Sequence, residues 1–108
     1  MEKQDTKQPC PDHDKQLELL IGIGLNYFKL EQWEKTIEYL HPALDAAKYL
    51  ENRKEEVQIL IDLAESYEKF GKKELVKSHL DQAEKMLNIT DENWRASLMR
   101  RIEFLRNF

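Results

Sequence analysis

The chain has 108 residues, which is enough for one domain and too short for two ordinary ones. Hydrophobic residues make up 41% of it and charged residues 35%, so a core can form and wholesale disorder is not expected. Only 3 Gly and 3 Pro are present, which leaves little turn chemistry for an all-β fold, whereas good helix formers dominate. The formal net charge of −4 argues against nucleic-acid binding by the whole domain. These features predict an all-α protein.

The N-terminal segment and the cysteine content indicate a cytoplasmic setting. Cys10 is the single cysteine, so no intramolecular disulfide can form and a reducing compartment is expected. Residues 1–13 are polar and contain two prolines, which predicts a flexible tail without a secretory signal. No apolar run approaches the ~20 residues needed to cross a bilayer, so no membrane span is expected. The folded domain should cover residues 14–108.

Apolar residues recur at helical spacing from Asp14 onward and predict two helices before residue 52. Pro42 lies inside the second helix, where it removes one backbone donor and crowds the carbonyl of Glu38. We therefore expect a kink or a local break there. The core face of the first helix carries Leu17, Leu20, Ile23, Gly24 and Tyr27, and that of the second carries Trp33, Ile37, Leu40 and Leu44.

Three more helices are expected after residue 52. Asn52 followed by Glu55 resembles a capping box that starts the third helix, and Gly71 suits the stop that ends it. Thr90, with Asp91 and Glu92 behind it, is interpreted as the N-terminal cap of a last helix over about 91–107. The fourth helix carries apolar residues at Leu75, Val76, Leu80, Ala83 and Leu87.

An internal repeat appears when the chain is shifted by 40 residues against itself. The small residues Gly24 and Ala64 coincide, which would let two antiparallel helices approach closely in each unit. The repeat predicts two helical hairpins, over about 15–52 and about 53–89. The other matched pairs are Leu20 with Leu60, Ile23 with Leu63, Tyr27 with Tyr67, Leu40 with Leu80, and Ala43 with Ala83.

These residues resemble the tetratricopeptide repeat (TPR) family, in its long-period subgroup of about 40 residues per unit. The usual leading Trp is Leu in both units, and the usual Ala of the second helix is Thr36 in one and Val76 in the other. The subgroup includes spindle-orientation and kinesin light-chain adaptors and bacterial peptide-sensing regulators of the Rap and PlcR type. The resemblance implies a right-handed superhelix of two hairpins with a C-terminal capping helix, and a partner-binding groove on its concave side.

The concave stripe carries the candidate binding residues. It is apolar in the first unit and acidic in the second, so a partner with apolar anchors followed by Lys or Arg would complement it. The alternative is that the apolar residues are core and the acidic ones a solvated face. The chaperone-tail clamp of Lys, Asn and Arg is absent at the matching positions. The candidate groove residues are Ile21, Leu25 and Phe28 in the first unit and Ile61, Asp62, Glu65 and Glu68 in the second.

The last helix is expected to cap the array by packing on the helix that contains Val76, Leu80 and Leu87. Its four arginines form no single basic face, so we interpret them as complements of the helix dipole and not as a membrane or nucleic-acid surface. Aromatic residues at this end are candidates for self-association, since short arrays can cover exposed ends by dimerising. These residues are Trp94, Phe104 and Phe108.

Signatures of catalysis are missing from the sequence. There is no phosphate-binding glycine loop, and no pair among His13, His41 and His79 has the spacing of helical metal ligands. We therefore expect no enzyme, no metal and no cofactor. The first hypothesis is an adaptor that binds a peptide or helix of another protein. The alternatives are a peptide-sensing regulatory domain and a structural module that homo-oligomerises.

Overall fold

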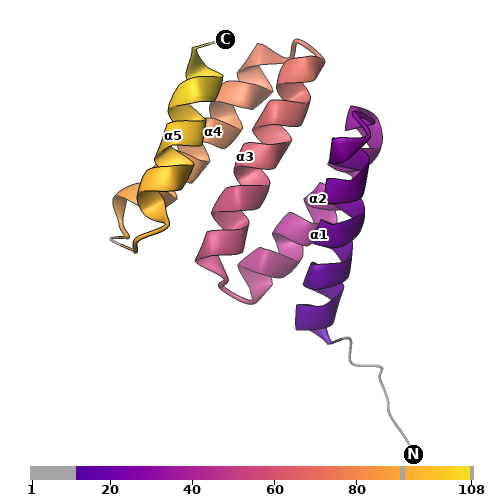
Figure 1. Cartoon of the computed structure of the whole chain (residues 1–108). Helices are drawn as coiled ribbons and strands as arrows, with labels where there is room; N and C mark the ends of the chain where they lie inside the picture. Colours follow the sequence, from indigo (N-terminus) through magenta and orange to yellow (C-terminus); the bar gives the residue numbers. More distant parts are fainter. Residues whose placement is uncertain (1–11, 91, 108) are drawn as a thin grey trace, which may run out of the picture.

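The computed structural model describes residues 12–90 and 92–107, and within these ranges the protein is entirely helical (Figure 1). This confirms the all-α prediction. Among the described helices, none is long and apolar enough to cross a membrane. The helices are α1 (His13–Lys29), α2 (Trp33–Tyr49), α3 (Arg53–Lys69), α4 (Lys73–Asn88) and α5 (Arg95–Arg106).

Successive helices run up and down in two layers. Figure 1 shows α1, α3 and α5 in front and α2 and α4 behind them. Each helix from α1 to α4 contacts the next one along the chain, and α5 contacts both α3 and α4. The middle helix of the front layer, α3, therefore has neighbours on most of its circumference, and it carries the largest share of fully buried side chains.

The three turns between the first four helices share one geometry. The helices begin at residues 13, 33, 53 and 73, and three-residue turns separate them. The middle turn residue has a positive φ each time, at Glu31 (59°), Glu51 (55°) and Gly71 (70°). The next amide donates to a carbonyl five residues earlier, at 2.9, 3.0 and 3.1 Å. This left-handed stop confirms the expectation for Gly71, while the same conformation at two glutamates was not expected from the sequence.

The core lies between the layers and depends on small residues at the helix crossings. Ala43, Ala64 and Ala83 are fully buried beside large aliphatic side chains from α2, α3 and α4. At Gly24, an added Cβ would lie only 2.8 Å from Cδ2 of Leu40, closer than real contacts allow. The prediction that Gly24 lets α1 and α2 approach closely is thereby confirmed.

Helix boundaries follow the sequence in part. The Asn52 side chain accepts a hydrogen bond from the Glu55 amide at 3.3 Å, which confirms the expected cap of α3. A local break at Pro42 does not occur, because α2 continues through it. Pro42 and Glu38 are both exposed, so water can reach the carbonyl that loses its donor, and buried neighbours hold the helix together through the site.

Both chain ends differ from the expected boundaries. Asp12 accepts a hydrogen bond from the Lys15 amide at 3.2 Å, so α1 begins at His13, inside the segment assigned to the tail. Residues 1–11, including Cys10, lie outside the described residues, as do Asp91 and Phe108. The last helix begins at Arg95 and not near residue 91. Thr90 Oγ1 accepts from the Glu92 amide at 3.3 Å, which makes a local turn in place of a helix cap.

The two hairpins bury equivalent positions to different extents. Ile59 of α3 is 2% exposed, whereas Leu19, 40 positions earlier on α1, is 67% exposed. Ser66 is likewise buried, and its counterpart Asn26 is exposed. The α2 helix packs against α3, but no described helix precedes α1. The face of α1 that carries Leu19 and Asn26, here called the uncovered edge of α1, is therefore exposed, whereas the equivalent face of α3 is buried.

Candidate protein-binding surface

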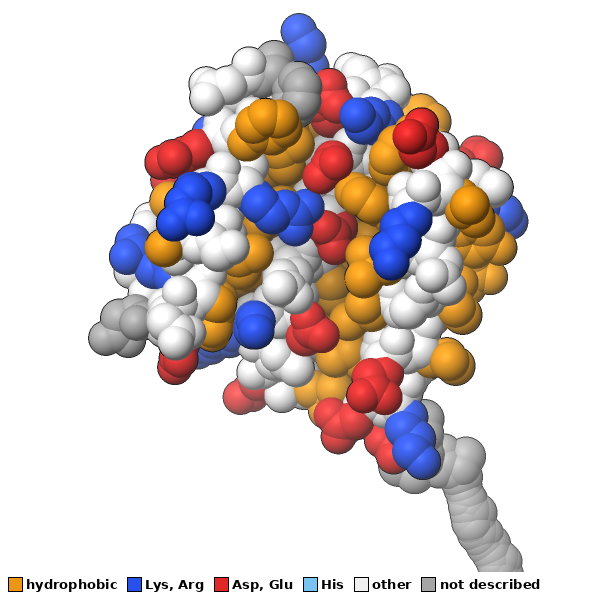
Figure 2. All heavy atoms as spheres, in the orientation of Figure 1, with side chains coloured by type: hydrophobic (Ala, Val, Ile, Leu, Met, Phe, Trp, Pro, Cys, Tyr) orange, Lys and Arg blue, Asp and Glu red, His pale blue; other side chains and the backbone are white. Residues whose placement is uncertain are grey.

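The apolar part of the candidate surface lies on α1. Ile21, Leu25 and Phe28 are all half-buried, and Ile21 packs against the main core. The Phe28 ring meets Trp33 edge-on, with centroids 5.2 Å apart, and the Lys69 ammonium lies 5.4 Å from the Trp33 ring centroid. Figure 2 shows hydrophobic side chains gathered where α1 lies beside α3. The three residues thus contribute to packing and still present apolar surface to solvent.

The acidic part lies on α3, and one of its expected members belongs to the core. Ile61 is fully buried, so it offers no surface to a partner. Its place in α3, which is flanked by α5 and backed by α2 and α4, explains this burial. Asp62, Glu65 and Glu68 are half-buried, and Figure 2 shows acidic side chains along α3 on this face.

Two of these carboxylates are bound by an arginine of α5. Nη2 of Arg101 donates to Oδ1 of Asp62 at 2.9 Å and to Oε1 of Glu65 at 3.2 Å. The Asp62 side chain is only 14% exposed. Burial raises the pKa of Asp62 above its ordinary value, and the charge and hydrogen bond of Arg101 partly offset this rise. The acidic surface of α3 is therefore occupied, near its middle, by a basic residue of the same chain.

A second arginine attaches the end of α5 to α4. Nη2 of Arg106 donates to Asp81 at 2.8 Å and to Glu84 at 2.7 Å, and Lys77 also contacts Asp81 at 2.9 Å. Together with the buried Leu98, Ile102 and Leu105, these ion pairs fix α5 on two helices, whereas the sequence had suggested packing on α4 alone. The sequence indicated a dipole role for the arginines and missed their specific carboxylates, since no local spacing links residues so far apart.

The residues considered for self-association are in different surroundings. Trp94 is half-buried and packs against the core, so it serves the fold directly. Phe104 is 66% exposed, and Phe108 lies outside the described residues. Other large exposed hydrophobic residues lie elsewhere, at Leu19, Leu30, Tyr49 and Ile89.

Two histidines that are far apart in sequence come together with a tyrosine. Nε2 of His41 lies 2.8 Å from the hydroxyl of Tyr67, and the ring centroids of His41 and His79 are 6.2 Å apart. Nδ1 of His79 lies 2.7 Å from the Leu75 carbonyl, to which it can donate. Burial and the nearby His79 lower the pKa of His41, against the opposing charge of Asp45. Helical spacing gave no sign of this cluster between α2, α3 and α4, because its members come from three different helices.

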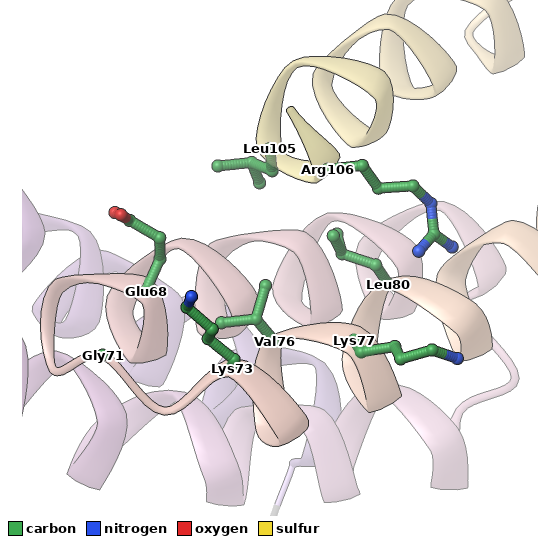
Figure 3. Close-up of a pocket in the computed structure, with 8 residues that line it drawn as sticks. All are labelled: Glu68, Gly71, Lys73, Val76, Lys77, Leu80, Leu105 and Arg106. Carbon is green, nitrogen blue, oxygen red and sulfur yellow. The ribbon is translucent and has the colours of Figure 1, made fainter. Parts of the chain in front are cut away.

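Two surface cavities lie beside α4, and Glu68 of the α1–α3 face lines the first of them. One, of about 510 Å³, lies between the end of α5 and the first half of α4 (Figure 3). The other, of about 370 Å³, lies on the outer face of α4 and has polar and charged walls. Within the described residues, no three His, Cys, Asp or Glu side chains form a group that could hold a metal ion.

The chain matches no family model, and no curated protein or solved structure is significantly similar to it.

Proposed function

We propose that this protein is a protein–protein interaction adaptor whose helices form a short TPR-like superhelix, and that its α1–α3 face binds a peptide or helix of a partner. The proposal rests on the contact of Arg101 with Asp62 and Glu65. In this contact α5, a helix of the same chain with buried apolar side chains and a basic residue, lies against α3. A partner of the same chemistry would find a comparable surface along α1 and α3.

The composition of the face supports this chemistry. Leu25 of α1 stands 40 residues before Glu65 of α3, so the same position is apolar in one hairpin and acidic in the other. Apolar side chains of a partner would pack on Ile21, Leu25 and Phe28, which are half-buried and so need little ordering. Its Lys or Arg residues would pair with Glu68, the candidate carboxylate of α3 that Arg101 does not bind, which favours basic partners over acidic ones.

A peptide-display selection tests the proposal, because it needs no identified partner. Random peptides are selected on the full chain, and the enriched peptides are titrated against wild-type protein, Leu25→Glu and Ile89→Glu. Ile89 is an exposed aliphatic residue outside the candidate face, which makes its substitution a matched control. We expect apolar and basic peptides that bind Leu25→Glu at least tenfold more weakly and the control unchanged. Equal binding to Leu25→Glu would exclude this face.

A second candidate function, homo-oligomerisation, is supported by the uncovered edge of α1. Leu19 is 67% exposed although its counterpart Ile59 is buried, and Ile23 beside it is only half-buried. Pairing of two such edges would bury apolar surface that the single chain leaves in water. Light scattering over a wide concentration range tests this candidate: a dimer that Leu19→Glu dissociates supports it, and a strict monomer excludes it.

A further inference from the structure

The cavity beside α5 has an apolar floor and a charged rim. Val76 and Leu80 of α4 face Leu105 of α5 across it, and Gly71 lies at its edge (Figure 3). Its volume of about 510 Å³ falls within the usual range of ligand sites, about 300–1,000 Å³. The rim carries four charged side chains: Glu68, Lys73, Lys77 and Arg106.

The equivalent positions of the first hairpin carry two aromatic rings. Positions 68 and 73 correspond, 40 residues earlier, to Phe28 and Trp33. Those two rings pack edge to face, with centroids 5.2 Å apart. The floor is similar in the two hairpins, because Val76 and Leu80 correspond to the buried Thr36 and Leu40. The second hairpin therefore keeps the floor of an aromatic packing site but has Glu68 and Lys73 where the rings would be.

The charges on the rim are not equally available. Arg106 is held by Asp81 and Glu84, Lys77 by Asp81, and Glu68 lies 3.9 Å from Lys69. Lys73 forms no ion pair with another described residue. In Figure 3 its side chain points toward the space beneath Leu105, whereas Lys77 extends away along α4. Among the charged rim residues, Lys73 is therefore the one whose ammonium group has no ion-pair partner in the described part of the chain.

We propose that this cavity binds an aromatic side chain that stands next to a carboxylate in a peptide segment of a partner protein. The ring packs on Val76, Leu80 and Leu105, next to the positions at which the first hairpin carries Phe28 and Trp33. The neighbouring carboxylate pairs with Lys73. This site shares only Glu68 with the α1–α3 face and has the opposite charge preference. Its test changes Lys73 of α4, which is not part of that face, so failure of one proposal does not imply failure of the other.

The test uses the full chain and a short synthetic peptide with one Phe flanked by two Asp residues and capped at both ends. Binding is followed by amide chemical shifts in NMR titrations, with the Phe→Ala peptide as the ligand control. Three variants are compared. Lys73→Trp restores the aromatic residue of the first hairpin and fills the cavity, Lys73→Glu reverses its free charge, and Lys54→Glu makes the same charge change at an exposed site on α3.

The expected result is saturable binding with the largest shifts at Val76, Leu80 and Leu105. Lys73→Trp should abolish it, Lys73→Glu should weaken it at least tenfold, and Lys54→Glu should leave it within twofold of wild type. A cooperative unfolding transition in each variant shows that the chain has folded. The proposal is overturned by no saturation at millimolar peptide, by equal binding of the Phe→Ala peptide, by undiminished binding to Lys73→Trp, or by shifts confined to α1.

Discussion

Replacing Arg101 with Met should destabilise the protein by more than the loss of a surface ion pair. Met keeps much of the aliphatic length of Arg but removes its charge and its donors. The guanidinium donates to two carboxylates, at 2.9 and 3.2 Å, and one of them belongs to Asp62, whose side chain is 14% exposed. The substitution would leave this half-buried group charged and without its partner.

The loss of stability caused by Arg101→Met should lie between the values for exposed and for buried ion pairs. An exposed ion pair contributes about 0–1 kcal/mol, and breaking a fully buried pair costs about 3–5 kcal/mol. Arg101 is 37% exposed and Glu65 30%, so water relieves part of the penalty. We expect the free energy of unfolding at neutral pH to fall by about 2 kcal/mol. In a domain of this size that corresponds to a drop of roughly 10 °C in Tm.

The loss of stability caused by Arg101→Met should become smaller as the pH falls. Burial raises the pKa of Asp62 in the folded state, so its charge reduces stability as the pH rises from the unfolded value of 3.8 through the folded pKa. Arg101 limits that loss. Without it the folded pKa rises further, and the difference between wild type and Arg101→Met should shrink as the pH falls and Asp62 becomes protonated.

Urea unfolding followed by circular dichroism at neutral and mildly acidic pH measures these differences. Arg100→Met is the matched control, because Arg100 is exposed and forms no ion pair with another described residue. Adding Asp62→Asn to Arg101→Met should recover most of the lost stability at neutral pH. A loss no larger than that of Arg100→Met, or one that does not change with pH, would refute the reasoning.

Three further outcomes are expected from the fold. Gly71→Ala should lower the free energy of unfolding by about 1 kcal/mol, because φ is +70° at this position. Glu51→Gly should raise it, because φ at Glu51 is also positive, at 55°. Urea titrations of both variants measure these changes. In the same assay, Ile59→Ala should lower the free energy of unfolding by about 2–5 kcal/mol, and Leu19→Ala by less than about 0.5 kcal/mol. The difference is expected because Ile59 is buried and Leu19 is exposed. Equal losses would contradict the assigned register. Burial, and then the nearby His79, lower the pKa of His41 in the folded protein. The folded protein therefore binds a proton at His41 less readily than the unfolded chain does. For this reason the free energy of unfolding should decrease as the pH falls below 6.5, the unfolded value. His41→Gln should remove that part of the pH dependence, and an unchanged profile of unfolding free energy against pH would exclude the assignment.

Features that depend on neighbours within a few residues were predictable from the sequence. Helical periodicity indicated the all-α fold, Asn52 indicated the start of α3, and Gly71 indicated the turn before α4. The same local reasoning failed at Thr90, because its hydroxyl can accept from a turn amide as well as from a helix. The TPR resemblance remains a prediction about superhelical arrangement and function.

The binding surface depended on tertiary structure, because burial and pairing are decided by what another helix places alongside. Leu19 and Ile59 occupy the same register position, yet among the described helices only α3, which carries Ile59, has a preceding helix packed against it. Arg101 and Asp62 are 39 residues apart, and only the packing of α5 on α3 brings their charges to 2.9 Å. Periodicity thus determined which residues share a helix face. The packing of the five described helices decided which of those faces contact water, a carboxylate or a surface cavity.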